Sequence, residues 1–540
     1  MKKVKLAVWT TAFAAIALAA IGYWFCCHSD MTSGEFGLIA KRGRILAADG
    51  SPLAYTVRNW MFHVDPMAAD IAALDIRTIQ RISDGLDIPA KVLIDAYIPG
   101  DAAHGGDTQT PRRYIYLKEA LDGGRETQFF EENRIWLVKR CGIIREPVQS
   151  RVYPLGAAAT AVTGFMHGGV HQEKPRGAAG MESALDAAMS GRDGICDKSL
   201  PAKERCLKAA PTAGDDVHTT IIPGLQTKVS DIIAAACATN GAESAWAVVM
   251  RVSDGAIAAM ASYPRFDPCA RRSLDTEGKE WTMAINHASG DVFEPGGLVK
   301  PLTYAIAIGE GVLSVDSHLD QEGGTWEYNG VTFNDEVANT LSIAEAIECR
   351  ANIAAGKTAC LIGPDRFHAA LRRLGFGAKT CASGISGEEV GILPATPENW
   401  RMDKTTAMRV GMGYGFAVTG LQIAQAYAAL ANHGRLVRPC LVKGTESVGE
   451  QAVDPVAADT IFAMLKKPMT STVQMYGNGK YIENAYIASC AGFLDDGQSQ
   501  YAIILAFAKP HPAYTGEEVA RPVWEEIAGE IQRSHHGNRF

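Results

Sequence analysis

The sequence has no excess of positive charge. Its 52 lysine and arginine residues are outnumbered by 60 aspartate and glutamate residues, which gives a formal charge of -8. A protein that binds nucleic acid usually carries a basic surface that neutralises phosphates. We therefore expect no nucleic-acid partner.

The sequence also lacks clustered histidines, internal repeats and long low-complexity segments. Its 13 histidines are scattered, and neighbouring histidines occur only in "RSHHGNRF" at the C-terminal end, where we expect a frayed tail. We therefore expect no metal site and no cofactor. A chain of 540 residues is longer than one hydrophobic core usually supports, so at least two domains are expected.

A long apolar run, Leu6–Cys27, follows the three lysines of "MKKVK" near the N-terminus. The run is long enough to cross a bilayer, and the lysines indicate a cytoplasmic N-terminus. A cleaved signal peptide is the alternative, because Ala17–Ala20 supplies small residues at a suitable place. We favour an uncleaved anchor, because the run continues past that place to Phe25 with aromatic residues typical of a membrane interface.

Twelve cysteines in an exported chain raise the question of disulfides. Cys196 and Cys206 bracket the polar loop "CDKSLPAKERC", where a local disulfide would limit the motion of the loop. Two unpaired thiols fit the sequence about as well, because connectivity cannot be deduced from spacing.

The pattern along the chain predicts an α+β protein. Alternating segments around Asp49-Gly50 and around residues 253–255 predict hairpins, and "GMESALDAAMSGRDG" predicts one helix with Met181, Leu185 and Met189 on one face. A helix is also expected from Leu225 to about Cys237, and a last strand pair in "IASCAGFL" and "QYAIILAFAKP". This order favours an antiparallel sheet with a helical lobe.

Several of these stretches, in this order, resemble the class B penicillin-binding proteins, which are bitopic peptidoglycan D,D-transpeptidases. The stretches are "RGRILAADGSPLA", "GMESALDAAMSGRDG", "AVVMRVSDGAIAAMASYPRFDP" and "GMGYGFAVTGLQIAQAYAALANHGRLVRP". The resemblance implies a cytoplasmic tail, a transmembrane anchor, an elongated pedestal domain of the dimerisation type, a transpeptidase-like domain and a C-terminal tail. In that order, they span residues 1–5, 6–27, 28–214, 215–533 and 534–540.

Active members of that family carry S-x-x-K within E-P-G-S-x-x-K, and the matching stretch here is "EPGGLVK". Gly297 therefore stands at the nucleophile position, with Lys300 three residues later. A serine and a lysine at this spacing share one helix face, so that the amine can take the hydroxyl proton. Glycine has no side chain for this step, and Ser289 is only a weak substitute.

The second motif, S-x-N, is matched by "RAN", with Arg350 in place of the serine and Asn352 retained. If Arg350 faces the cleft, its charge lowers the pKa of Lys300, but it could equally face solvent. Cys349 is a weak candidate for a substitute nucleophile.

The third motif, K-[ST]-G, is expected on the strand beside the nucleophile, where it binds the substrate carboxylate and shapes the oxyanion pocket. "GNGKYIENA" resembles the stretch before this motif and "IASCAGF" the strand after it. We therefore expect the segment that carries the motif to be deleted. Loss of a serine nucleophile costs roughly 10^6 in turnover, so we expect no acylation by penicillin and no cross-linking.

The resemblance implies a noncatalytic scaffold or regulator of peptidoglycan synthesis in cell division or elongation. Its anchor would lie in the bacterial inner membrane, with the bulk of the chain in the periplasm. Its partners would be a multi-pass glycan polymerase of the shape, elongation, division and sporulation (SEDS) type and other division or elongation proteins. Two alternatives remain open: an active transpeptidase with an unorthodox site, and a sensor that binds muropeptides through Lys300, Arg350 and Asn352.

Overall fold

The structure is a computed structural model. It describes residues 35–70, 74–97, 115–167, 175–197, 207–268, 286–380, 384–394, 397–446, 448–477 and 480–536. The anchor expected at residues 6–27 and the tail at residues 1–5 lie outside this part of the chain. Within it, no helix is both long and apolar enough to span a bilayer.

The chain divides into two compact units, of which the smaller comprises Met1–Gly43 and Ala187–Asp216. Its described part is a three-stranded antiparallel sheet in the order β1-β8-β9, formed by Glu35–Leu38, Gly194–Asp197 and Leu207–Ala209. Cys196 lies in β8, but Cys206 lies outside the described residues. The disulfide between them therefore stays a prediction.

The larger unit begins with a sheet built on one long strand, β3 (Pro52–Val64). Antiparallel partners pair with it along its length: β2 (Ile45–Leu46), β4 (Ile115–Leu121) and β5 (Ile143–Val152). The β2–β3 hairpin turns at Asp49-Gly50, as the sequence predicted. Gly50 has a φ of +85°, a conformation that favours glycine.

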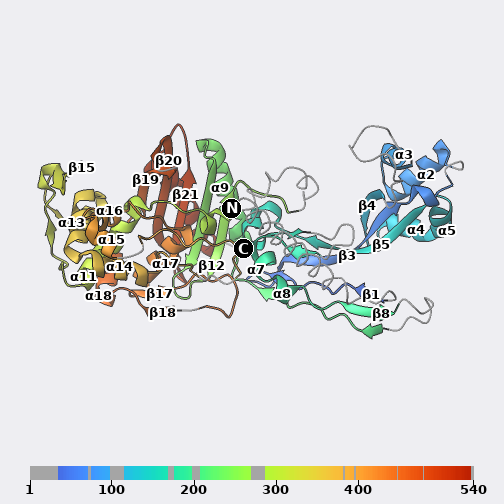
Figure 1. The fold of residues 1–540 in the computed structure, drawn as a ribbon, viewed down its shortest axis with the longest axis horizontal. Helices are drawn as coiled ribbons and strands as arrows, with labels where there is room; N and C mark the ends of the chain where they lie inside the picture. Colours follow the sequence, from blue (N-terminus) through green and yellow to red (C-terminus); the bar gives the residue numbers. More distant parts are fainter. Residues whose placement is uncertain are drawn as a thin grey trace, which may run out of the picture. The chain divides into compact units, whose positions relative to one another are not determined.

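Four helices pack around one end of this sheet, and we call α2 to α5 together with β4 the head (Figure 1). The helices are α2 (Ile76–Leu86), α3 (Ala90–Tyr97), α4 (Arg125–Glu132) and α5 (Arg134–Lys139). α2 begins where the Asp75 side chain accepts a hydrogen bond from the Thr78 N–H. It buries Ile79, Ile82 and Leu86 in the core of the head, and its opposite face is polar.

The helix predicted in "GMESALDAAMSGRDG" is in fact two short helices, α7 (Gly180–Ala184) and α8 (Asp186–Met189). Met181 and Met189 are fully buried, as predicted, whereas Leu185 lies at the break and is half-buried. Glu182 in α7 is buried and accepts a hydrogen bond from Arg151 Nε at 2.7 Å. Packing around this buried ion pair, rather than one regular apolar stripe, determines the local structure.

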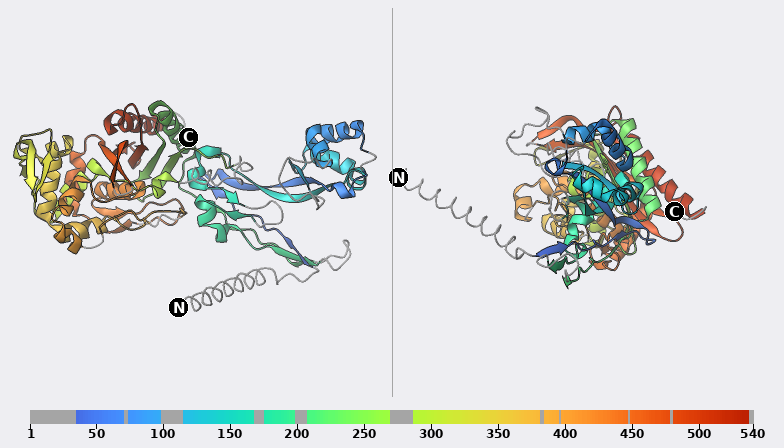
Figure 2. Two further views of the ribbon diagram at one scale, coloured as in Figure 1. Left: turned by 45° about the horizontal axis from the view of Figure 1, so that its top comes forward. Right: turned by 90° about the vertical axis from the view of Figure 1, so that its right-hand side faces the viewer.

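The second part of the larger unit contains a five-stranded antiparallel sheet in the order β12-β11-β21-β20-β19. Its strands are β11 (Ser244–Arg251), β12 (Ile257–Tyr263), β19 (Met469–Gly477), β20 (Lys480–Asp495) and β21 (Gln500–Ala508). The predicted hairpin at residues 253–255 and the C-terminal strand pair are both confirmed. Helices α9 (Pro223–Asn240) and α19 (Arg521–His536) share one apolar core with this sheet (Figure 2).

The remaining helices form a lobe beside the sheet, so the α+β prediction is confirmed. They are α10 (His287–Gly290), α11 (Lys300–Gly309), α12 (Ile343–Glu348), α13 (Asn352–Ile362), α14 (Pro364–Arg373), α15 (Pro397–Met402), α16 (Thr406–Met412), α17 (Gly420–Ala431) and α18 (Pro455–Met464). The hairpin of β14 (Thr325–Tyr328) and β15 (Val331–Asn334) packs on α13. Nearly every residue of α11 and α17 is buried, and these two helices are the core of the lobe.

Candidate active site

The turn before Gly297 is fixed by contacts to a second turn, Gly413–Gly415. Gly296 N–H donates to the Gly413 carbonyl at 2.9 Å, and Gly415 N–H donates to Glu294 Oε1 at 2.7 Å. A Cβ on Gly413 would lie 1.9 Å from the Gly296 carbonyl oxygen, so glycine is required for this approach. The two turns therefore fix the backbone around Gly297.

Gly297 lies in a short 3-10 turn, η6 (Gly296–Val299), which leads directly into α11 at Lys300. The Lys300 side chain is not solvated, because only 3% of the residue is exposed. Its Nζ donates to Asn352 Oδ1 at 2.8 Å and also to the Arg350 carbonyl oxygen. The structure thus brings Lys300, Arg350 and Asn352 together, as the family resemblance implied.

Burial shifts the protonation of this lysine. It lowers the pKa of Lys300 to about 7, although the charge of Asp335 works in the opposite direction; Arg350 lowers it further. The lysine therefore loses much of its positive charge near neutral pH. The direction agrees with the effect expected of a nearby arginine, but burial is the larger cause.

Asp335 was missed by the sequence analysis; together with Lys300 and Asn352 it forms the inner part of the site, which we call its floor. Its Oδ2 accepts hydrogen bonds from the N–H groups of Asn352 and Ile353, at 2.5 and 3.1 Å, at the first turn of α13. A carboxylate is favourable at a helix N-terminus. An aspartate 17 residues before the helix gives no local capping signal, because a short strand (Leu341–Ser342) and α12 lie between them in the chain.

The Arg350 side chain reaches the edge strand of the sheet, although it is partly exposed to solvent. Its Nη1 donates to Thr470 Oγ1 at 2.7 Å and to Glu517 Oε2 at 3.2 Å. Thr470 Oγ1 in turn donates to Glu517 Oε2 at 3.0 Å. Arg350 therefore joins the helical lobe to β19 and to the turn that precedes α19.

The backbone of Arg350 also departs from the usual conformation. Its φ of +56° lies in the left-handed region, which costs a residue other than glycine roughly 1–2 kcal/mol. This conformation turns the carbonyl of Arg350 toward Lys300 while the side chain reaches the edge strand.

The prediction that the third-motif segment is deleted is wrong. The strand beside η6 is β19, and Gly297 N–H donates to Ser471 Oγ at 3.0 Å. "GNGKYIENA" leads into β20, which continues without a break into "IASCAGF" and pairs with β19. The resemblance of that stretch therefore pointed to a place downstream of the edge strand, and the alternating "MTSTV" was the strand signal that was overlooked.

Met469, Thr470 and Ser471 thus lie where the K-[ST]-G motif was expected. Met469 is buried and uncharged, so it supplies no cation for a substrate carboxylate. The hydroxyl of Ser471 occupies the Gly297 N–H, a donor that in acyl transfer would face the developing oxyanion. A Cβ on Gly297 would lie 3.2 Å from the Thr470 carbonyl oxygen, a tight fit for any side chain there.

The two substitute nucleophiles considered from the sequence are Cys349 and Ser289. Cys349 is exposed and follows α12. Ser289 is buried in α10, and its hydroxyl donates to the Asn286 carbonyl at 3.2 Å. Among the described residues, neither forms a hydrogen bond with Lys300 Nζ, so neither is paired with a base for activation.

Much of this chain is similar to proteins of one known family. Residues 245–529 match the penicillin binding protein transpeptidase domain. The chain is 26% identical over 524 residues to peptidoglycan D,D-transpeptidase FtsI of Escherichia coli, covering 92% of this chain and 84% of that protein. It is 26% identical over 481 residues to penicillin-binding protein PbpB of Mycobacterium tuberculosis, covering 80% and 68%.

Solved structures show the same fold. The crystal structure of penicillin binding protein 2X from Streptococcus thermophilus matches with a TM-score of 0.71 at 18% identity, covering 92% of this chain and 81% of the other. Together with the transpeptidase domain match over more than half of the chain, this establishes the family. The chain belongs to the class B penicillin-binding proteins.

Proposed function

We propose that this chain is a noncatalytic class B penicillin-binding protein that scaffolds or regulates peptidoglycan synthesis. One observation carries the proposal: at the position of the nucleophile stands Gly297, and its N–H is occupied by Ser471 Oγ. Serine acyl transfer needs a hydroxyl, a base that takes its proton and free donors for the oxyanion. Only the lysine of this set is present, and its amine is bonded to Asn352 and to the Arg350 carbonyl.

The exposed side of the site, formed by Arg350, Thr470 and Glu517, supports the same proposal, and we call it the mouth of the site. Arg350 occupies the serine position of the second motif and bridges to Thr470 on the edge strand. A substrate strand added beside β19 would have to displace this bridge and the Glu517 carboxylate that shares it. Restoring one serine would therefore leave the remaining obstacles in place.

The framework around the cleft is intact, which suggests that selection acts on the fold. We propose that residues 6–27 anchor the chain in the bacterial inner membrane, with the N-terminus in the cytoplasm. Residues 28–214 act as a periplasmic pedestal. The pedestal and the anchor bind a multi-pass SEDS-type glycan polymerase and other proteins of division or elongation.

A complementation experiment tests this function. In cells that lack the gene, we expect envelope growth to be restored by the wild type and equally by Lys300→Met, which removes the remaining base. A chimera in which residues 28–214 come from another class B protein should fail to restore growth. Failure of Lys300→Met at normal protein level, with success of the chimera, would favour an active enzyme and contradict the proposal.

Partner binding is tested separately. A glycan polymerase that co-purifies with the wild type should polymerise lipid-linked disaccharide precursor at a rate that changes when the chain is removed. If no polymerase co-purifies and calorimetry instead detects binding of muropeptides, the chain is a sensor. Loss of that binding in Arg350→Gln would then identify the cleft as its site.

A further inference from the structure

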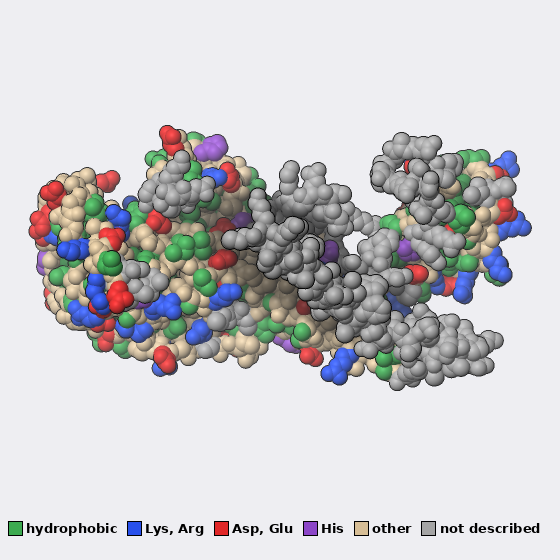
Figure 3. All heavy atoms as spheres, in the orientation of Figure 1, with side chains coloured by type: hydrophobic (Ala, Val, Ile, Leu, Met, Phe, Trp, Pro, Cys, Tyr) green, Lys and Arg blue, Asp and Glu red, His purple; other side chains and the backbone are tan. Residues whose placement is uncertain are grey.

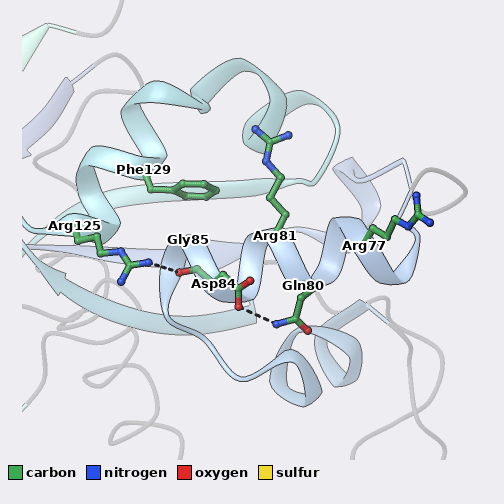
Figure 4. Close-up of a pocket in the computed structure, with 7 residues that line it drawn as sticks. All are labelled: Arg77, Gln80, Arg81, Asp84, Gly85, Arg125 and Phe129. Carbon is green, nitrogen blue, oxygen red and sulfur yellow. Dashed lines mark hydrogen bonds between the residues drawn. The ribbon is translucent and has the colours of Figure 1, made fainter.

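The head carries a cavity that the cleft and its chemistry do not explain. It has a volume of about 540 Å³ and lies between α2 and α4 (Figure 4). Phe129 forms its floor, because this ring lies directly on the α2 backbone at Gly85. A Cβ on Gly85 would lie 2.3 Å from ring atoms of Phe129, so the glycine makes room for the ring.

Three arginines surround this aromatic floor: Arg77, Arg81 and Arg125. All three are exposed, and within the described part of the chain none of them forms an ion pair with a carboxylate. Asp84 is the acidic residue in the lining, and its carboxylate accepts a hydrogen bond from Gln80 Nε2 at 2.8 Å. The cavity therefore presents three guanidinium groups against one carboxylate.

This arrangement is unfavourable for the helix alone. Arg77 and Arg81 are four residues apart on α2, and like charges at that spacing destabilise a helix by roughly 0.2–0.5 kcal/mol. Asp75 and Asp87 lie close enough to Arg77 and Arg125 to interact with them electrostatically, so this charge is balanced in part. Figure 3 shows basic side chains gathered over the head, whereas acidic and basic side chains are interspersed over the helical lobe.

Arg81 is held in position rather than free to move. Its Nη2 donates to Asn133 Oδ1 at 2.8 Å, and its guanidinium lies 4.5 Å from the centroid of the Trp136 ring. Asn133 and Trp136 also line a second cavity of about 560 Å³ on α4 and α5. Ile135 also lines that cavity and is 77% exposed. Arg81 thus stands between two hollows, each with polar and apolar parts.

We propose that this surface of the head, which we call the arginine pocket, binds an extended acidic segment of a partner protein. Carboxylates of the segment pair with Arg77, Arg81 and Arg125, whose planar guanidinium groups suit bidentate contacts. An aromatic or aliphatic side chain between those carboxylates packs on Phe129. Glu131 and Glu132 line the second cavity, so the carboxylates of the segment are expected over the three arginines of the first.

The same charges could attract an anionic membrane surface, but the shape favours a peptide. A bilayer contacts protruding lysines and arginines, whereas the Phe129 ring lies between α2 and α4 against Gly85, where a single side chain can reach it (Figure 4). The inference does not depend on whether the cleft is catalytic, because the arginine pocket lies in a different part of the fold.

The test uses the full-length chain in detergent and the fluorescein-labelled peptide EDEFEDE, with QNQFQNQ as the uncharged probe. In fluorescence anisotropy at low salt, we expect the acidic peptide to bind at least ten-fold more tightly than the uncharged one. The combined variant Arg77→Gln, Arg81→Gln and Arg125→Gln should weaken this binding at least ten-fold. Its Tm should fall only slightly, because these exposed side chains make no ion pair and lose only the contacts of Arg81 with Asn133 and Trp136 and a long hydrogen bond from Arg125 to the Asp84 carbonyl.

A matched control removes the same charge elsewhere. Lys91→Gln, Lys228→Gln and Lys404→Gln together replace three exposed lysines that do not line the cavity. This variant should bind EDEFEDE within two-fold of the wild type. Equal weakening in the two triple variants would mean that only overall charge matters, and would overturn the proposal.

A second variant tests the contact with Phe129 without changing the charge of the pocket. Gly85→Ala should displace the Phe129 ring and weaken EDEFEDE several-fold, while the peptide EDEGEDE should lose little. Vesicles containing phosphatidylglycerol provide the other comparison. Absence of EDEFEDE binding, or selective loss of vesicle binding in the arginine variant without loss of peptide binding, would also overturn the proposal.

Discussion

The floor and the mouth of the site are built from neighbouring residues, but the lysine at the floor is buried and the mouth is exposed. At the floor, Lys300 is buried and bonded to Asn352, and Asp335 holds the first turn of α13. At the mouth, the side chains of Arg350 and Glu517 are 46% and 44% exposed. A buried polar group must keep its partners, whereas an exposed ion pair contributes little to stability. Stability therefore constrains the residues of the floor, whereas the residues of the mouth can be replaced at little cost to the fold.

The largest effect should follow removal of the buried lysine. Lys300→Ala leaves a cavity and two acceptors without their donor, so we expect a loss of about 3 kcal/mol of stability. Lys300→Met is the matched control, because it fills the volume and removes only the amine. It should lose less than about half as much, a difference that thermal unfolding at pH 8 measures. Equal losses would mean that the hydrogen bonds, not the volume, dominate at the floor.

The next largest effect is expected in the pH dependence of stability, and it comes from Lys300. The pKa of Lys300 is lowered to about 7 in the folded chain, whereas an exposed lysine has a pKa of about 10.5. Between these values the unfolded chain binds more protons, so stability rises as pH increases through this window. Below pH 7 both states are charged, and the cost of burying the charge is fully present.

The wild type should therefore gain stability relative to Lys300→Met between pH 7 and pH 10, by up to a few kcal/mol. The comparison with Lys300→Met cancels the titration of other groups. Parallel Tm curves for the two proteins over this range would show that Lys300 stays charged in the folded chain.

A smaller effect is expected at the start of α13. Asp335→Ala removes the acceptor for the Asn352 and Ile353 N–H groups, at a cost of about 1–2 kcal/mol. Asp335→Asn keeps an oxygen acceptor and should lose less. The variants also probe Lys300, because the charge of Asp335 raises its pKa, and the pH window should move down when that charge is removed. Identical Tm values for all three proteins would exclude this capping role.

The smallest effect should come from the mouth. Arg350→Gln and Glu517→Gln each break an exposed ion pair, so we expect losses below about 1 kcal/mol. Hydrogen exchange should become faster around Thr470, while the amides of α11 stay protected. Lys467→Gln is the control, because it breaks another exposed pair, with Glu348. A loss in Arg350→Gln as large as that in Lys300→Ala would remove the distinction between floor and mouth.

Sequence reasoning located the floor better than the mouth. The family resemblance grouped Gly297, Lys300 and Asn352, although Gly297 and Lys300 lie at the start of α11 and Asn352 at the start of α13. It could not decide where the side chain of Arg350 points, since that depends on Thr470, 120 residues away in the chain. β19 was missed for the same reason: its pairing with β20 and its contact with η6 are tertiary facts, and a short local likeness in "GNGKYIENA" directed attention downstream.

The proposal that this chain is noncatalytic is tested most directly by labelling the full-length chain with a fluorescent penicillin, alongside a known active class B protein. We expect no covalent label on the wild type, and none on Gly297→Ser alone, because Arg350, Met469 and Ser471 remain. Label should return, if at all, only when Gly297→Ser is combined with Arg350→Ser, Met469→Lys and Ser471→Gly. Stable, saturable label on the folded wild type would contradict the account, and peptide mapping of the adduct would name its nucleophile.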